Sequence, residues 1–464
     1  MFKGVPVRCL TAVLCALLSM QMGCGPGLPR REEAVSEDNR TAEFWIKKVS
    51  DPDRIIMNEK EIAVFNQEIM KTLPQVIKDL AAYPEEVAGE SILDVINEQQ
   101  YPQKPLYYCG QQLGASFYDG LLQEMNLGGI KSVSKLRCAY TIRRTSIRSF
   151  PTRLLVTDDP GDLEFDLFQE TALDPAEPVI VLHESVSGKW CFVQASFYKG
   201  WVPVADLAVA TSREDWLLYL QADSFLVVTG SRLRLGYNPY SPEISELEFF
   251  MGARIPLAAR DGIPRVVDKQ SPSGSYVVKL PTRGRNGELA FKLTLVPRGS
   301  DVSVGYLPYT GASVIKQAFK MQGERYGWGG MFNSRDCTAF VRDIYRCFGF
   351  HFPRNSREQG SLPGRTVYLA DADRKERERQ LDGLRPGAVL LMPGHVMLYL
   401  GKHQGEYYVI HAIASCGERG KVNPDGSLVP VPLNGVVVTT LSLPRRSNGV
   451  ELIMSLTSAK QIGS

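Results

Sequence analysis

One stretch of the chain places a cysteine at the start of what the residue pattern predicts to be a buried helix. Five apolar side chains follow Cys337 at helical spacing, namely Phe340, Val341, Ile344, Tyr345 and Phe348. Asp336 is a typical N-cap residue, and Gly349 is a typical helix stop. Because the free N–H groups and the positive end of such a helix favour a thiolate, we expect the pKa of Cys337 to lie below that of a free thiol. A lone cysteine in an apolar run is otherwise more often a small buried side chain, so this prediction needs support elsewhere in the chain.

That support comes from the histidines, of which the chain has only five. His395 opens an alternating apolar run that is typical of a half-buried strand, and His411 closes the next such run. Residues 401–405 between the two runs predict a hairpin loop. One hairpin would therefore hold both imidazoles side by side, with His395 as the base and acid for Cys337 and His411 as the group that orients His395.

Residues from about 309 to 445 resemble the NlpC family of papain-like cell-wall peptidases. The matching blocks are, in order, Tyr326-Gly327-Trp328-Gly329-Gly330, Asp336-Cys337, Pro353-Arg354-Asn355-Ser356 with Gln359, Leu384-Arg385-Pro386-Gly387, Gly394-His395-Val396 and Val409-Ile410-His411-Ala412. Two features depart from the family pattern. Thr338-Ala339 stand where the family usually has Ser-Gly, and the two histidines lie further apart than usual. The wider spacing leaves His403 as an alternative to His411.

The resemblance implies a thiol mechanism on murein stem peptides. In such a peptidase Cys337 attacks, His395 is the base and acid, and His411 orients it, while Tyr326 stabilises the developing oxyanion. The bond cut would be the amide between the γ-carboxyl of D-Glu and the diamino acid, meso-diaminopimelate in many bacteria. No metal and no cofactor are expected.

The resemblance also implies side chains that recognise a stem peptide with a free N-terminal L-Ala. The positions that match the alanine-binding residues of the family are Asp336, Thr338 and Ser356. Arg354 is the expected partner of the D-Glu α-carboxylate, with a structural ion pair as the alternative. An acid and a tyrosine from the preceding domain would complete the amine pocket, and we choose Glu170 and Tyr198 for these positions.

The regions before the peptidase-like part have different residue patterns. Residues 135–210 contain short β-rich runs separated by Gly, Ser and Pro, and their run from Gly188 to Val202 resembles a bacterial SH3-like barrel. Residues 211–303 have a similar profile and predict a second SH3-like domain. Residues 25–134 contain amphipathic helical patterns and predict a helical clip. With residues 304–464 as the catalytic domain, the expected fold is α+β: a papain-like NlpC domain preceded by two SH3-like barrels and a helical N-terminal segment.

The first 24 residues predict an export signal. Lys3 and Arg8 precede a short apolar run that cannot span a bilayer by itself. Gly23-Cys24 followed by Gly-Pro-Gly resembles a bacterial lipoprotein cleavage site, at which Cys24 would be acylated. We therefore expect an exported, periplasmic protein, either anchored to the outer or cytoplasmic membrane through lipid on Cys24 or simply secreted.

Charge and cysteine content exclude other classes. The 53 Lys and Arg residues nearly balance the 51 Asp and Glu residues, so no basic field is available for nucleic acid, and the short pair Arg445-Arg446 does not change this. The nine cysteines include no CxxC pair and no zinc-like spacing. We expect a monomer whose partners are murein stem peptides.

Two alternatives stay open. The same scaffold could act as a murein amidase or as a crosslink-cutting endopeptidase, which would need an open cleft upstream of Cys337. In a different class of protein, the SH3-like modules would bind the wall and the thiol site would be catalytically silent. The joint presence of Cys337, His395 and His411 argues against the silent site, because a decayed site should lose at least one of them.

Overall fold

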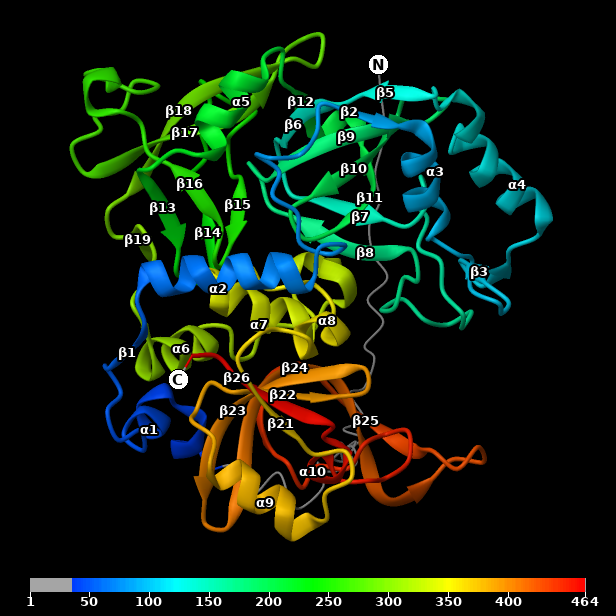
Figure 1. The fold of residues 1–464 in the computed structure, drawn as a ribbon, viewed down its shortest axis with the longest axis vertical. Helices are drawn as coiled ribbons and strands as arrows, with labels where there is room; N and C mark the ends of the chain where they lie inside the picture. The colour runs from blue at the N-terminus through cyan, green and yellow to red at the C-terminus, as the bar shows by residue number, and fades with distance from the viewer. Residues whose placement is uncertain (1–35, 464) are drawn as a thin grey trace, which may run out of the picture.

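The computed structural model describes residues 36–463 (Figure 1). The predicted export signal and Cys24 lie outside these residues. Figure 1 shows two β-rich parts side by side at one end of the molecule and a mixed helix and strand part at the other. No helix in the described range has the length and apolar content needed to cross a membrane.

The N-terminal segment is helical, and its first half packs on the C-terminal part whereas its second half packs on the first β-rich part. Its helices are α1 (Ala42–Ile46), α2 (Glu59–Thr72), α3 (Gly89–Asn97) and α4 (Ala115–Glu124), and its short strands are β1 (Ile55–Met57), β2 (Glu86–Ala88), β3 (Tyr107–Tyr108), β4 (Gln111–Gln112) and β5 (Val133–Lys135). α2 buries Ile62, Phe65 and Ile69, which confirms the amphipathic pattern, and it ends where Pro74 follows. The amide of Asn66 donates to the carbonyl of Gly349 over 2.8 Å, which ties α2 to the C-terminal part.

The first β-rich part is one seven-stranded antiparallel sheet. Its strands, in spatial order, are β12 (Leu207–Val209), β6 (Arg137–Thr141), β9 (Pro178–Glu184), β10 (Trp190–Ala195), β11 (Lys199–Pro203), β7 (Thr145–Arg148) and β8 (Gln169–Leu173). Alternating side chains point into its core, where Phe192 and Trp201 are completely buried with ring centroids 5.4 Å apart. β8 is the edge strand that faces the C-terminal part.

The second β-rich part divides into smaller sheets. After α5 (Arg213–Leu220), β13 (Phe225–Val228) lies between β16 (Arg254–Pro256) and β19 (Val302–Val304), while β14 (Arg232–Arg234) pairs with β15 (Glu248–Phe250) and β17 (Ser275–Arg283) pairs with β18 (Leu289–Pro297). The region is therefore β-rich as expected. Its assignment as a second SH3-like domain stays a prediction.

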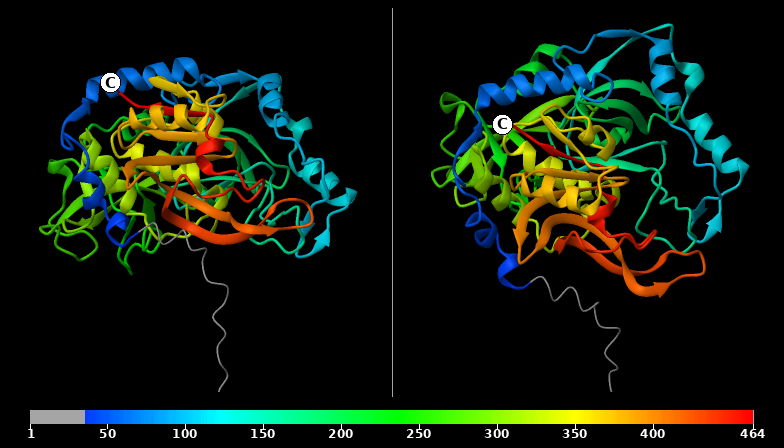
Figure 2. Two further views of the ribbon diagram at one scale, coloured as in Figure 1. Left: turned by 90° about the horizontal axis from the view of Figure 1, so that it is seen from below. Right: turned by 60° about the horizontal axis from the view of Figure 1, so that its bottom comes forward.

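The C-terminal part packs helices onto a six-stranded antiparallel sheet. The strand order is β21 (Arg365–Tyr368), β26 (Ser458–Gln461), β22 (Val389–Met392), β23 (His395–His403), β24 (Glu406–Val422) and β25 (Leu428–Thr440), and a short strand β20 (Tyr309–Thr310) pairs with β1. The helices are α6 (Gly311–Phe319), α7 (Cys337–Arg346), α8 (Ser356–Gly360), α9 (Arg374–Asp382) and α10 (Leu452–Ser455). α7 packs on β23 and β24. Figure 2 shows the ribbon of β24 and β25 extending beyond the rest of this sheet.

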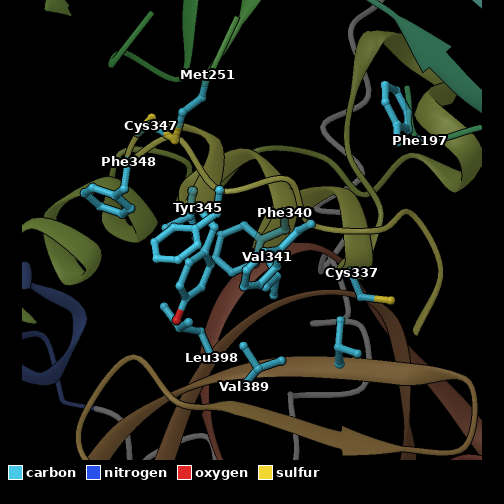
Figure 3. Packing of buried hydrophobic residues seen from close by; sticks show 14 of the residues in the cluster. Phe197, Met251, Cys337, Phe340, Val341, Tyr345, Cys347, Phe348, Val389 and Leu398 are labelled. Atoms are coloured by element: carbon cyan, nitrogen blue, oxygen red, sulfur yellow. The ribbon is translucent and has the colours of Figure 1, made fainter. Parts of the chain in front are cut away.

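α7 is the helix that the sequence predicts. It begins at Cys337 with Asp336 as N-cap, and Gly349 shortly after its end has a φ of 89°, a conformation that favours glycine. Phe340, Val341 and Tyr345 are completely buried between this helix and the sheet (Figure 3). Their burial fixes the helix against β23 and β24, and with it the position of the thiol.

Candidate active site

Cys337 lies at the N-terminus of α7, at the margin of the buried apolar cluster (Figure 3). The N-cap side chain of Asp336 accepts a hydrogen bond from the N–H of Ala339 over 2.9 Å. The backbone N–H of Val396 on β23 donates a hydrogen bond to the Cys337 sulfur. The backbone N–H of Thr338, the next residue of α7, does the same. Because Val396 follows His395 directly, this contact brings the thiol to the strand end that carries the imidazole.

His395 and His411 form a buried pair. Nε2 of His395 lies 2.7 Å from Nδ1 of His411, and Nε2 of His411 lies 3.0 Å from the hydroxyl of Thr439 on β25. β23 continues to His403 and β24 begins at Glu406, so only Gln404 and Gly405 form the turn, which is shorter than the predicted loop of residues 401–405. The longer strands accommodate the wider spacing of the two histidines. His403 sits near this turn against Phe44 and 3.3 Å from Lys48, so His411 rather than His403 contacts His395.

One arrangement of protons lets His395 serve as a base. With Nε2 of His395 engaged by His411, its Nδ1 is the nitrogen left for the thiol proton of Cys337. Nδ1 must then be unprotonated, so Nε2–H of His395 donates to His411, and Nε2–H of His411 donates to Thr439. This chain holds the ring of His395 in one tautomer and one orientation.

The Cys337 thiol is less acidic than the sequence suggests. Burial, followed by the charge of Asp336, raises the pKa of Cys337 to about 12. The N–H groups of Val396 and Thr338 and the guanidinium of Arg354 act in the opposite direction but are outweighed. The expectation of a lowered pKa is therefore wrong for the resting state, because the helix N-terminus that favours a thiolate is desolvated and faces a carboxylate.

The pKa values of both histidines are also shifted from their ordinary value. Burial, with a smaller contribution from the charge of Arg445, lowers the pKa of His395 to about 4. Burial and the neighbouring His395 hold the pKa of His411 well below its ordinary value. Both rings are thus neutral near pH 7, and the resting site contains a neutral thiol beside a neutral imidazole. Such a pair can transfer the thiol proton as the sulfur attacks.

Tyr326 lies near the thiol as the resemblance implies. Its ring is almost completely buried, and its N–H donates to the carbonyl of Asn434 over 3.0 Å. Burial raises the pKa of Tyr326, and the nearby Cys337 and Asp336 raise it further. The phenol therefore stays protonated and can donate a hydrogen bond to an oxyanion.

Arg354 forms a buried ion pair with Asp336. The whole residue is only 3% exposed, and its guanidinium donates to Asp336, to the hydroxyl of Thr338 and, over 2.7 Å, to that of Thr171 on β8. Asp336 also accepts hydrogen bonds from Ala339, Thr338 and the N–H of Gly329. The structure thus contains the ion pair that the sequence left open as the alternative role of Arg354, and both oxygens of Asp336 are already occupied.

Glu170 and Tyr198 come together beside this ion pair. The hydroxyl of Tyr198 donates to the carboxylate of Glu170, which is half-buried on β8. Burial raises the pKa of Glu170, while Tyr198 and the charge of Arg354 act to lower it. Ser356 begins α8, whose Gln359 donates to the carbonyl of Thr338 over 3.1 Å. The structure therefore brings the chosen acid and tyrosine within electrostatic reach of the residues around the thiol.

The first β-rich part packs against the loop that precedes Cys337. The amide of Gln169 donates to the carbonyl of Gly329 over 2.8 Å, and the indole of Trp328 donates to the carbonyl of Asp166 over 3.1 Å. Gly329 has a φ of 56°, and a Cβ there would lie 2.8 Å from the backbone of Gln169. Glycine is therefore required for this close contact. Residues 164–171 form a wall against the loop that precedes Cys337.

A groove opens on the other side of His395. It has a volume of about 450 Å³ and is lined by Tyr326, His395 and the basic pair Arg445 and Arg446. The guanidinium of Arg445 donates to the carbonyl of Pro393 over 3.3 Å. The groove gives His395 an accessible side that carries two guanidinium groups and the carboxylate of Asp425.

Three of these residues escape sequence reasoning. Thr439 belongs to an apolar strand with no polar motif, and only the strand pairing brings it to His411. Gln169 precedes the chosen Glu170 without any signal of its own. Arg445 is visible as part of a basic pair, but its distance along the chain hides its closeness to His395. Among residues 36–463, no group of three or more His, Cys, Asp or Glu side chains is arranged to hold a metal ion.

A cysteine at the N-terminus of a helix, packed on an antiparallel sheet that presents histidines, defines a papain-like thiol hydrolase. Comparison with protein families gives two matches. Residues 323–417 match the NlpC/P60 family, and residues 157–203 match the SH3 domain of SH3b1 type. The chain therefore contains an NlpC/P60-type domain and an SH3-like domain, which is consistent with an NlpC-type cysteine peptidase. Members of the NlpC/P60 family hydrolyse peptide bonds of peptidoglycan.

One solved structure shares the fold over most of the chain. An NlpC/P60 endopeptidase from Photobacterium damselae subsp. piscicida superposes with a TM-score of 0.71 at 16% identity, covering 90% of this chain and 96% of that one. An NlpC/P60 family protein from Bacillus cereus has a TM-score of 0.42 at 21% identity, covering 64% of this chain and 83% of that one. No curated protein matches the chain in sequence. The first of these structures extends the likeness in fold to nearly the whole chain.

Proposed function

We propose that the protein cleaves the amide between the γ-carboxyl of D-Glu and the diamino acid of murein stem peptides that carry a free N-terminal L-Ala. The observation that carries this proposal is the meeting of three parts at one place. Cys337 begins α7, the hydrogen-bonded pair of His395 and His411 lies on the sheet beneath it, and Glu170 with Tyr198 lies beside the Asp336 and Arg354 ion pair.

In the proposed reaction, the neutral thiol of Cys337 and the neutral imidazole of His395 act together. As the sulfur of Cys337 attacks the γ-carbonyl of D-Glu, its proton moves to Nδ1 of His395, and Tyr326 donates a hydrogen bond to the developing oxyanion. The same proton then passes to the leaving amine of the diamino acid, which leaves a thioester on Cys337. Water, activated by His395, hydrolyses the thioester and restores the thiol. His411 and Thr439 hold His395 in position throughout.

The amine end of the substrate fits the side closed by the SH3-like domain. Both oxygens of Asp336 are occupied within the protein, so the half-buried carboxylate of Glu170 is the better partner for an alanine ammonium. An ammonium beside Glu170 would offset the burial that raises its pKa. The wall formed by residues 164–171 leaves no room in this proposal for a muramic acid group on the same nitrogen.

The leaving side of the substrate fits the groove beside His395. A diamino acid of the diaminopimelate type carries two carboxylates besides its amino groups. Arg445 and Arg446 line the groove and supply positive charge for them. The two sides of the thiol thus differ in charge in the sense that this substrate requires.

The test is mass spectrometry of two peptides incubated with the mature protein. One is free L-Ala-γ-D-Glu-diaminopimelate, and the other is the same peptide still attached to muramic acid. We expect cleavage of the free peptide alone, abolished in Cys337→Ala and retained in Cys347→Ala, the matched change of a second buried cysteine at the end of the same helix. The Cys347 variant separates loss of the nucleophile from loss of packing around α7.

Other outcomes would select the alternatives. Cleavage of both peptides would keep the chemistry and overturn the closed amine pocket. Cleavage at the lactyl-alanine amide or at a crosslink would select a murein amidase or a crosslink endopeptidase. Cleavage of nothing by a folded protein would overturn the proposal and favour a wall-binding protein with a silent thiol site.

We also propose export to the periplasm, with lipid on Cys24. The support is the sequence of residues 1–24, in which a basic start and a short apolar run precede Gly23-Cys24. Intact-mass measurement of the mature protein tests this proposal. A diacylglyceryl adduct that disappears in Cys24→Ser is expected, whereas an unmodified mature N-terminus would leave simple secretion, and retention of residues 1–24 would overturn export.

A further inference from the structure

A second cavity lies away from the thiol, where four parts of the chain meet. It has a volume of about 460 Å³ and lies between α2, the SH3-like sheet, the second β-rich part and the far end of α7. Much of its lining is apolar, and examples from each side are Ile77, Phe197, Tyr219 and Phe352. This size and lining are typical of a site for a small organic molecule.

Arg342 on α7 is the unusual polar group of this cavity. Its side chain is buried, with the whole residue only 6% exposed, and it lines the cavity wall. Its guanidinium lies 3.5 Å from the ring centroid of Phe197 and 3.6 Å from a carboxylate oxygen of Asp343. Within residues 36–463, it donates no hydrogen bond. Asp343 meanwhile accepts a hydrogen bond of 2.7 Å from Arg335, so its charge is shared.

The other cations of the cavity differ from Arg342 in this respect. Arg346 pairs with Glu177 and lies 3.5 Å from Asp174. Arg254 donates to two backbone carbonyls, and the ammonium of Lys78 donates to the carbonyl of Pro74 over 2.6 Å. Each of these groups is used within the fold. Arg342 is therefore the cation whose hydrogen-bonding capacity is left for a ligand.

A buried guanidinium without hydrogen bonds is costly for a protein. Buried charges are normally paired and hydrogen-bonded, because desolvation is otherwise not offset. Burial, and then the charge of the neighbouring Arg346, lowers the pKa of Arg342 to about 9. An anion in the cavity would supply the missing hydrogen bonds and remove this penalty.

We propose that this cavity binds a small organic carboxylate whose single negative charge lies on Arg342 and whose apolar body fills the rest of the space. A guanidinium presents two N–H groups in the geometry that a carboxylate accepts. One cation with free donors matches one negative charge, and the lining matches an apolar body. The site is separate from the thiol site and does not depend on the reaction proposed there.

The experiment measures binding of three small probes by isothermal titration calorimetry. The probes are benzoate, its neutral counterpart benzyl alcohol, and phenyl phosphate. We expect benzoate to bind and to raise the melting temperature, with benzyl alcohol at least about tenfold weaker, since a charge-assisted bidentate contact is lost. Tighter binding of phenyl phosphate than of benzoate would replace the carboxylate by a phosphate ester, and equal binding of all three would overturn the role of Arg342.

Variants separate a binding role from a structural one. Arg342→Met should abolish benzoate binding while leaving stability unchanged or raising it, because a buried charge without hydrogen bonds has been removed. If Arg342 only holds Phe197 and Asp343 in place, the same variant should lower the melting temperature, and benzoate should not bind the unchanged protein. Ser196→Phe narrows the cavity with Arg342 intact and should also block benzoate. Arg379→Met on the exposed face of α9 is the matched control and should bind as the unchanged protein does.

Discussion

Nε2 of His395 and Nδ1 of His411 lie 2.7 Å apart, although 16 positions separate the two residues in the chain. Antiparallel pairing of β23 with β24 brings them together, and Thr439 on β25 closes the chain of hydrogen bonds. In the proposed mechanism this relationship gives His411 a positioning role, since it holds the proton of His395 on Nε2 and leaves Nδ1 for the thiol proton. The consequences can be measured.

Removing His411 should slow the reaction more than removing Thr439. We expect kcat to fall by about 100-fold or more in His411→Ala, because His395 loses its orienting partner, and by about 3- to 10-fold in Thr439→Val. KM should change little in either variant. Steady-state kinetics on the free stem peptide measures both values, with His403→Ala as control. A kcat in His411→Ala equal to that of the unchanged protein would contradict the positioning role.

The pH profile should reflect a neutral thiol and imidazole. Below the pKa of His395, at about 4, the ring is protonated and cannot accept the thiol proton, so kcat/KM should rise with pH through that region and then stay level. The pKa of Cys337, at about 12, also predicts that alkylation by iodoacetamide accelerates continuously up to at least about pH 10. Mass spectrometry of Cys337 in a Cys109→Ser background measures this rate. A plateau of alkylation at neutral pH would instead show a preformed thiolate.

Acid should destabilise the fold through His395. Its pKa is about 4 in the folded protein and near 6.5 when unfolded, so between these values the unfolded chain binds more protons and stability falls as the pH falls. The full contribution of His395 to the free energy of unfolding is therefore present above pH 6.5, and about 3 kcal/mol of it is lost when the pH falls to 4. Urea unfolding of Cys337→Ala with and without His395→Gln, at pH 7 and pH 4, measures the difference. The Gln variant should lose less stability on acidification, and equal losses would contradict the lowered pKa.

Glu170 should determine recognition of the free amine. Glu170→Gln removes the negative charge proposed to face the alanine ammonium, and we expect KM to rise by about 10-fold or more with a smaller change in kcat. Tyr198→Phe should have a weaker effect in the same direction. An N-acetylated substrate should be cut poorly by all of these proteins. Glu184→Gln, on an exposed strand end of the same sheet, is the control, and a similar rise in KM there would remove the special role of Glu170.

Arg445 should influence both the substrate and the base. Its positive charge contributes to lowering the pKa of His395, so Arg445→Met should move the acidic limb of kcat/KM to higher pH. The same change should raise KM for a diaminopimelate substrate more than for one that ends in lysine amide. Arg446→Met tests the neighbour, which should affect KM without moving the limb. An unmoved limb in Arg445→Met would show that the groove acts on the substrate alone.

Much of the catalytic part could be predicted from local patterns. The helix that begins at Cys337, its N-cap and the glycine after it were all visible, because helical period and capping depend on residues a few positions apart. The strands that carry His395 and His411 were visible for the same reason, although β24 runs on to Val422, well beyond the apolar run that predicts it. α9 is a highly charged helix, yet Arg377 within it is buried and donates to four backbone carbonyls, which no local pattern predicts.

Residue type and local spacing were enough to predict Cys337 at the start of a helix, His395 and His411 on neighbouring strands, and the NlpC-type domain that holds them. The charge state of the site depends instead on how distant segments pack around it, since desolvation raises the pKa of Cys337, against the local effect of the helix, and lowers that of His395. The packing also pairs Arg354 with Asp336. Arg342, about one and a half turns of helix after Cys337, by contrast donates no hydrogen bond within residues 36–463. Burial and long-range pairing depend on which distant segments meet, and no local pattern specifies that meeting.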